Sequence, residues 1–141
     1  MVLDDDFDIN SLIKVALQNH GYNVFGFTDP LLALEHFKIN LSTYSLVMPD
    51  LRMLLMNGFE FVRKVKKMNP KIKVLLMTAF EINDREFTRV LPELKIEGFI
   101  QKTNINEKIE WYYRHAYDAR IVSFMSFVNL PLKSFIYPLN E

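Results

Sequence analysis

The chain has 141 residues and a mass of 16.7 kDa, which is long enough for one domain with a substantial core. Lys and Arg together number 17, as do Asp and Glu, so the net charge is zero and a free-standing nucleic-acid binder is not favoured. The absence of cysteine excludes disulfides, thiolate zinc sites and thiol nucleophiles. The first residues form no signal peptide and no apolar run reaches the ~20 residues of a spanning helix, so we expect a cytoplasmic location.

Short apolar runs alternate with amphipathic stretches over the first 120 residues. This alternation is typical of an α/β fold, in which a doubly wound parallel sheet carries helices on both faces. We expect five strands, at residues 2–3, 24–27, 44–48, 73–77 and 98–100.

The first two helices have clear boundary signals. A helix is expected after Asp8, closed by Gly21 and with one apolar face made by Ile9, Leu12, Ile13, Ala16 and Leu17. A second helix should be capped by Thr28 or Asp29 and has Pro30 in its first turn, where a missing N–H costs nothing.

Three further helices are expected. Asn57 and Gly58 open the third, whose inward face is formed by Phe61, Val62, Val65 and Met68. The fourth follows Asn83 and Asp84 and is disturbed by Pro92, and the fifth covers residues 106–120.

Chemically active side chains stand at the carboxyl ends of the predicted strands, where open α/β sheets bind ligands. These residues are Asp4, Asp5, Asp6, Asp50, Thr78 and Lys102. Clustered carboxylates raise each other's pKa values unless a cation is present. An all-oxygen set from Asp4, Asp5, Asp50 and a backbone carbonyl suits Mg²⁺, with which a carboxylate could attack phosphorus and form an acyl phosphate. The competing interpretation of Asp4 to Asp6 is that they only open a helix.

The sequence resembles the receiver domains of two-component response regulators. The resemblance covers about residues 1–118 and depends on four segments, Val-Leu-Asp-Asp-Asp at 2–6, Leu-Val-Met-Pro-Asp-Leu-Arg-Met at 46–53 with Met-Asn-Gly at 56–58, Leu-Leu-Met-Thr-Ala at 75–79 and Gly-Phe-Ile-Gln-Lys at 98–102. It implies the flavodoxin-like strand order 2-1-3-4-5.

The resemblance also implies roles for single residues. Asp50 would be the phosphoacceptor, and Asp4, Asp5, Asp50 and the carbonyl of Arg52 would hold Mg²⁺. Lys102 would bind the phosphoryl oxygens. Thr78 would be the switch hydroxyl and Phe99 the aromatic residue that changes rotamer with it.

Expected partners follow from this resemblance. A histidine kinase or phosphotransfer protein would supply the phosphoryl group. The signal would leave as a conformational change of the face made by the fourth helix, the fifth strand and the fifth helix, through a downstream protein or self-association. Neither direct nucleic-acid binding nor conventional enzyme activity is expected.

Three departures from the family pattern favour an alternative, a pseudo-receiver that acts as a phosphorylation-independent interaction module. Pro49 precedes Asp50 in a central strand, Leu54-Leu55 stands where the family usually has Pro-Gly, and Thr103 stands where it usually has proline. A third hypothesis, an Mg²⁺-dependent phosphohydrolase with an aspartyl nucleophile, would need a second acid two residues after Asp50, where Arg52 stands.

The last 21 residues differ from the rest. Residues 121–141 are rich in apolar and aromatic side chains, and their only charges are Lys133 and Glu141. We therefore expect a receiver domain at residues 1–120 and an apolar extension at 121–141. The extension would be buried against the domain itself, a second copy, a partner or, with the least support, a membrane surface.

Overall fold

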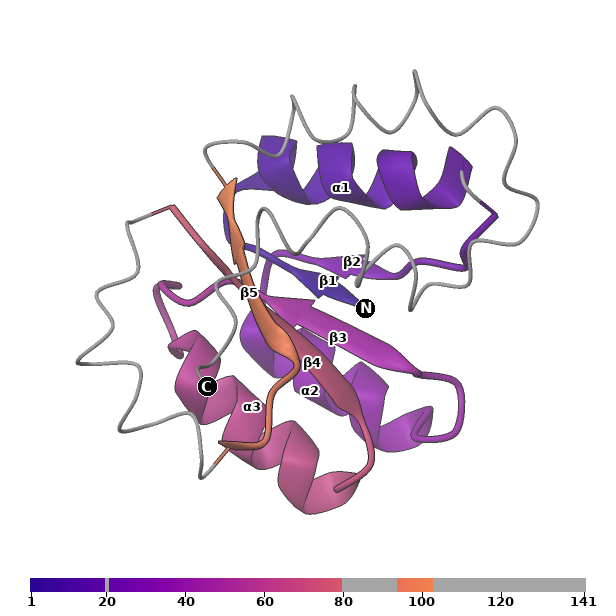
Figure 1. Ribbon diagram of the computed structural model, residues 1–141, viewed down its shortest axis with the longest axis vertical. Coiled ribbons are helices and arrows are strands. Elements are labelled where there is room, and N and C mark those ends of the chain that lie inside the picture. Colours follow the sequence, from indigo (N-terminus) through magenta and orange to yellow (C-terminus); the bar gives the residue numbers. More distant parts are fainter. Residues whose placement is uncertain (20, 80–93, 103–141) are drawn as a thin grey trace.

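The computed structural model describes residues 1–19, 21–79 and 94–102, which form a parallel five-stranded sheet (Figure 1). The strand order is β2-β1-β3-β4-β5, as predicted. The strands are β1 (Val2–Leu3), β2 (Gly26–Phe27), β3 (Leu46–Pro49), β4 (Lys73–Thr78) and β5 (Gly98–Gln101). β1 lies between β2 and β3, because Val2 pairs with Gly26 of β2 on one side and with Met48 of β3 on the other.

Helices cover both faces of the sheet (Figure 1). The helix α1 (Phe7–Asn19) lies on one face, and α2 (Pro30–Ile39) and α3 (Gly58–Met68) lie on the other. Two core clusters match this division, since successive strand residues point to opposite faces. One contains Val2 with residues of α1, and the other contains Leu3 with residues of α2 and α3.

Side-chain caps fix the helix starts. Asp29 accepts the N–H groups of Leu31 and Leu32, and Asn57 accepts that of Glu60, so these caps agree with the sequence. The end of α1 is followed by Gly21, whose φ of 86° is the left-handed conformation expected of a helix-closing glycine.

The predicted apolar faces are largely buried. Phe61, Val62 and Val65 of α3 are buried, and Met68 packs against the same cluster. One residue of α1 was assigned wrongly, because Leu12 is 36% exposed. It lies at the edge of the apolar stripe, where a helix meets solvent.

Two strands begin later than their apolar runs predicted. β2 comprises only Gly26–Phe27, and β3 begins at Leu46. Val24 and Tyr44, which were expected to lie in these strands, are nevertheless buried. The buried apolar run is therefore longer than the stretch of backbone that pairs in each of these two strands.

Pro49 interrupts one ladder without changing its register. Val47 pairs with Val74, and the next β3–β4 pairing is the bridge between Asp50 and Met77. In both pairs the β4 residue follows the β3 residue by the same number of positions, so the two strands stay in register across Pro49. The expected cost of the missing donor, on the order of 1 kcal/mol, is thus confined to one position.

Several predictions lie outside the described residues. They are the fourth helix after Asn83-Asp84, the fifth helix at 106–120, the extension at 121–141, the domain boundary and Thr103. Among the described residues, none of the helices has both the length and the apolar character needed to cross a membrane.

Candidate phosphoryl-acceptor site

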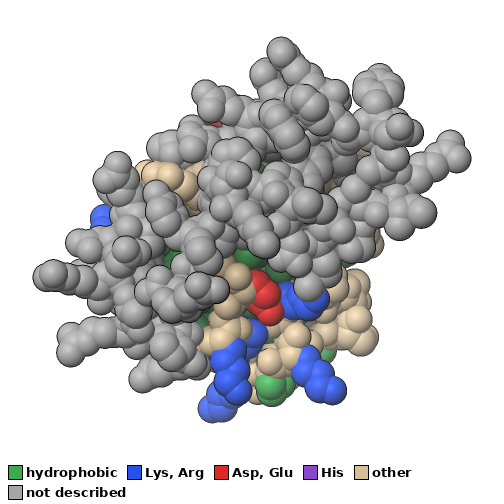
Figure 2. All heavy atoms as spheres, in the orientation of Figure 1, with side chains coloured by type: hydrophobic (Ala, Val, Ile, Leu, Met, Phe, Trp, Pro, Cys, Tyr) green, Lys and Arg blue, Asp and Glu red, His purple; other side chains and the backbone are tan. Residues whose placement is uncertain are grey.

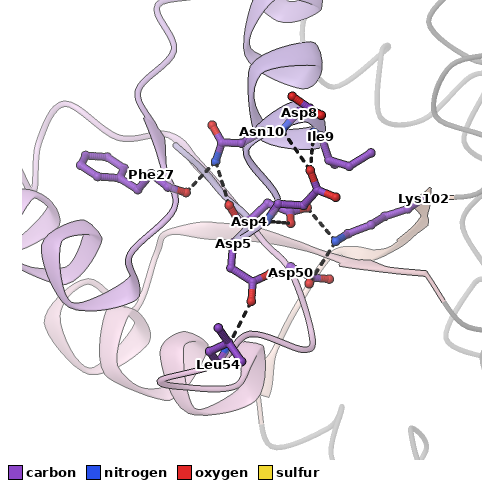
Figure 3. Close-up of polar contacts among 10 residues, drawn as sticks. Asp4, Asp5, Asp8, Ile9, Asn10, Phe27, Asp50, Leu54 and Lys102 are labelled. Carbon is purple, nitrogen blue, oxygen red and sulfur yellow. Dashed lines mark hydrogen bonds and ion pairs between the residues drawn. The ribbon is translucent and has the colours of Figure 1, made fainter.

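The carboxyl ends of β1, β3 and β5 bring Asp4, Asp50 and Lys102 together (Figure 3). The Lys102 Nζ lies 2.7 Å from Asp4 Oδ2 and 3.0 Å from Asp50 Oδ2. Asp4 is fully buried and Asp50 is 5% exposed, so one ammonium is shared by two carboxylates that are shielded from water. The predicted convergence of these strand ends is present.

The three consecutive aspartates have different environments. Asp4 accepts the N–H of Asp6, and its second oxygen faces Lys102. Asp5 is exposed and accepts the N–H of Leu54 at 3.2 Å, which connects it to the loop after β3 (Figure 3). Asp6 accepts the N–H groups of Asp8 and Ile9 and thereby caps α1. The helix-opening interpretation therefore fits Asp6, whereas Asp4 and Asp5 belong to the acidic cluster.

Burial and mutual contacts shift the pKa values of Asp4, Asp50 and Lys102. Desolvation raises the pKa of Asp4 and of Asp50 above the usual range, and the hydrogen bonds to Lys102 only partly oppose it. Desolvation would lower the pKa of Lys102, but its hydrogen bonds to Asp4 and Asp50 and their charges raise it instead. Lys102 thus stays protonated, but its single positive charge cannot balance the charges of both buried carboxylates.

A divalent cation fits this charge deficit. Asp4, Asp5 and Asp50 each offer an oxygen, and these oxygens lie within 4.8 Å of one another. The buried Asp4 Oδ2 contacts Lys102 Nζ at 2.7 Å, and that same ammonium also faces Asp50. Carboxylate oxygens are the ligands that Mg²⁺ prefers, and water completes its shell. The donor set therefore suits Mg²⁺.

The backbone of Asp50 is held from both sides. Its N–H donates to Leu3 O at 2.7 Å, and the next N–H, of Leu51, donates to Met77 O at 2.8 Å. The N–H of Gly58, at the start of α3, donates to Leu51 O at 2.9 Å. Asp50 consequently projects from a fixed point between β1, β4 and α3.

The remaining predicted residues lie on neighbouring elements. Thr78, the last residue of β4, is 1% exposed, and Phe99 of β5 is fully buried in the core cluster of α2 and α3. Arg52 is exposed, two residues beyond Asp50. The metal-ligand role of its carbonyl and the switch roles of Thr78 and Phe99 stay predictions.

Sequence reasoning missed one buried polar residue near the site. Asn10 of α1 is 5% exposed, and its Nδ2 donates to Phe27 O at 2.6 Å. A signal was available, because Asn10 stands three and seven residues before Ile13 and Leu17 and so shares their apolar stripe. A polar residue in such a stripe usually has a buried partner.

The lysine and arginine residues of α3 lie away from the acidic cluster. Lysine and arginine side chains gather at the lower end of the face in Figure 2, where α3 ends and β4 begins in Figure 1. Arg63, Lys64 and Lys67 are exposed, and Lys66 Nζ donates to Ile72 O at 2.6 Å. Arg63, Lys64 and Lys67 thus lie on a solvated helix face, whereas the Lys66 ammonium is bound by a backbone carbonyl.

Comparison with known proteins identifies the family. The model of the response regulator receiver domain matches residues 1–113. The chain belongs to this family. Among curated relatives, transcriptional regulatory protein ZraR of Klebsiella oxytoca is 37% identical over 84 residues, which are 60% of this chain and 18% of ZraR. Response regulator receiver protein CpdR of Brucella abortus is 29% identical over 80 residues, which are 57% of this chain and 65% of CpdR. The chain therefore spans less than a fifth of ZraR and about two thirds of CpdR.

Solved receiver structures share the fold. Chemotaxis protein CheY4 of Vibrio cholerae has a TM-score of 0.67 at 22% identity, over 80% of this chain and 92% of CheY4. The CheX–CheY–BeF₃–Mg²⁺ complex of Borrelia burgdorferi contains a chain with a TM-score of 0.68 at 15% identity, over 82% of this chain and 86% of that one. At these identities the comparison establishes the receiver fold alone.

Proposed function

We propose that this receiver accepts a phosphoryl group on Asp50 from a histidine kinase or phosphotransfer protein, in the presence of Mg²⁺. The observation that carries the proposal is the contact of one ammonium, Lys102, with both Asp4 and Asp50 inside a cluster of three carboxylates. A buried carboxylate beside a fixed cation and a set of metal ligands is what phosphoryl transfer to an aspartate needs.

The residues divide the chemistry among them. A carboxylate oxygen of Asp50 would attack phosphorus, forming an O–P bond while the P–N bond of the phosphohistidine breaks and the imidazole leaves. Asp4, Asp5, Asp50 and the Arg52 carbonyl would hold Mg²⁺, which supplies charge neutralisation of the phosphoryl oxygens when bound. Lys102 would move its contact from the Asp50 carboxylate to a phosphoryl oxygen, a charge-assisted hydrogen bond.

The proposed signal arises from the charge added at Asp50. Thr78 would donate its hydroxyl proton to a phosphoryl oxygen, and Phe99 would follow by changing rotamer. This local charge change would bias the face containing β5 and the helices expected on either side of it. The receiver would thus act in a phosphorelay as a cytoplasmic signalling domain, its output a downstream protein contact or self-association.

Intact-mass measurement tests the proposal. Acetyl phosphate with Mg²⁺ should add one phosphoryl group to the parent protein, and Asp50→Asn should abolish the addition. Lys102→Ala should reduce labelling, because the phosphoryl oxygens lose their cation. Asp8→Asn, which removes an exposed carboxylate of α1, is the matched control and should be labelled like the parent.

A pseudo-receiver is the second candidate, and the loop after β3 favours it. Leu54 is 91% exposed and Leu55 67% exposed at the edge of the acidic cluster, an apolar pair suited to a protein contact rather than to phosphate. Absence of labelling under conditions that phosphorylate another receiver would select this candidate and reject phosphoryl transfer.

A further inference from the structure

Asn10 joins three segments at the end of β1 (Figure 3). Its Nδ2 donates to Phe27 O at 2.6 Å and lies 3.5 Å from Asp4 O. The Phe27 carbonyl also accepts the N–H of Asp4 at 3.1 Å. Asp4 N–H, Phe27 O, Asn10 Nδ2 and Asp4 O therefore form a closed ring of polar contacts around the backbone of Asp4, which we name the Asn10 clamp.

Gly26 provides the space for this clamp. A Cβ at Gly26 would lie 2.3 Å from Asn10 Oδ1, much closer than such atoms approach. The backbone of Gly26 is not in a left-handed conformation, so an alanine would meet no backbone strain there. The nearest obstacle is the end of a side chain, and the expected response is displacement of the Asn10 amide.

We propose that Asn10 is a positioning residue for the acid pair Asp4 and Asp5, and that it sets the affinity of the site for Mg²⁺. This inference rests on the proposed function, because it concerns the ion that the pair would hold. The carbonyl of Asp4 belongs to the peptide that links the two aspartates. Fixing that peptide fixes the directions in which both carboxylates leave the backbone.

The expected effect on metal affinity is substantial. Contacts behind metal ligands typically account for a factor of about 10 to 100 in affinity, because they hold the ligands in place before the metal arrives. Without the amide of Asn10, Asp4 O loses a donor and Phe27 O keeps only the Asp4 N–H. The end of β1 would then sample orientations in which the two carboxylates diverge.

A purely structural role for Asn10 makes a different prediction. Loss of a buried hydrogen bond would lower the urea midpoint of unfolding and leave the Mg²⁺ affinity of the folded protein unchanged. Ile13→Val is a suitable control, because it removes one methylene from the α1 core, lowers the urea midpoint by a comparable amount and touches no polar contact of Asp4.

The experiment compares the parent with Asn10→Ala, Gly26→Ala, the double variant and Ile13→Val. Mg²⁺ is titrated while backbone amide NMR shifts are followed, and urea unfolding in EDTA gives the stability of each metal-free protein. We expect each single clamp variant to raise the Kd for Mg²⁺ about tenfold. The double variant should be no weaker than Asn10→Ala, since both substitutions remove the same contact. Ile13→Val should keep the parent Kd.

A second readout needs no metal. The amide proton of Asp4 should exchange with solvent faster in Asn10→Ala than in Ile13→Val at matched stability, because the acceptor Phe27 O loses its second anchor. If Asn10→Ala does not fold, Gly26→Ala carries the test, since it retains every hydrogen-bonding group.

The outcomes separate the two proposals. A parent that binds no Mg²⁺ would reject the metal-dependent function and the role of the clamp in it. A parent that binds Mg²⁺, with the same Kd in Asn10→Ala and Gly26→Ala, would reject the clamp alone. Additive losses in the double variant would also reject it, because they would mean that the two residues act independently.

Discussion

Gly58, the first residue of α3, lies directly against the backbone of Asp50. A Cβ at Gly58 would be 2.5 Å from Asp50 O and 2.9 Å from Leu51 Cα. The obstacle is backbone, which cannot move aside as the end of a side chain can. Because α3 approaches the backbone of the candidate phosphoacceptor so closely, position 58 has room only for glycine.

Gly58→Ala should destabilise the protein and weaken the site. We expect a loss of roughly 1–3 kcal/mol in the free energy of unfolding, the usual cost of inserting a methyl group into a filled space. The displaced Asp50 backbone should also lower the extent of labelling by acetyl phosphate. Urea unfolding and intact mass measure the two effects. Glu60→Ala, at an exposed position of the same helical turn, should show neither.

Asp50→Asn should stabilise the metal-free protein at neutral pH. Burial raises the pKa of Asp50, so folding favours the protonated carboxyl. This favourable contribution is complete below the unfolded pKa, about 3.9, and is lost as pH rises through the higher folded pKa. An amide does not titrate, so we expect the variant to gain roughly 1 kcal/mol at pH 7, the size of a typical single-site effect.

Urea unfolding in EDTA at several pH values between 4 and 7 measures this difference. The advantage of Asp50→Asn over the parent should grow with pH and be smallest at the acidic end. An advantage that is constant with pH would contradict the role of burial. Asp8→Asn, which changes an exposed carboxylate, should show no such trend.

Asp5→Asn should weaken Mg²⁺ binding by about tenfold or more, because one of three formal ligand charges is lost. The variant should fold normally, since Asp5 is exposed and its carboxylate accepts a surface hydrogen bond from the Leu54 N–H. Amide NMR shifts during Mg²⁺ titration give the Kd. Equal affinities in Asp5→Asn and the parent would place the ion elsewhere, and Asp8→Asn serves again as the control.

Arg52→Ala should shorten the lifetime of the phosphorylated protein a few-fold. Arg52 follows Asp50 by two residues and is exposed. If its side chain flanks the proposed phosphoryl group, its bulk hinders in-line approach of water to phosphorus. Loss of the phosphoryl mass with time after removal of acetyl phosphate measures hydrolysis. Arg63→Ala removes an exposed arginine from α3 and should hydrolyse at the parent rate. Phe80, two residues after Thr78 in the sequence, offers a second variant of the same kind.

Truncation after Arg120 tests the proposed division into a domain at 1–120 and an extension at 121–141. We expect the extension to bury its aromatic side chains, each worth roughly 1.5–3 kcal/mol when fully buried. Light scattering and thermal unfolding of both forms decide where. A monomer in both forms with a lower Tm on truncation would assign the extension to the domain's own core, and loss of a dimer would assign it to self-association.

The strand-end chemistry was predictable from the order of residues along the chain. Asp4, Asp50 and Lys102 were predictable as one cluster, because parallel strands all end at the same edge of a sheet. Helix starts at Asp29 and Asn57 were equally readable, since capping is a local interaction between a side chain and the next turn.

The contact partner of each of the three adjacent aspartates became known only from the folded structure. Their sequence context is nearly identical, yet Asp4 meets Lys102, Asp5 meets Leu54 and Asp6 caps α1. Those differences depend on residues about 50 and 100 positions away, which no local pattern can register. The same holds for Asn10 and Gly26, which come close together only because α1 packs against β2. Local patterns encode what a residue can do, and packing between distant segments decides which of those options each residue takes.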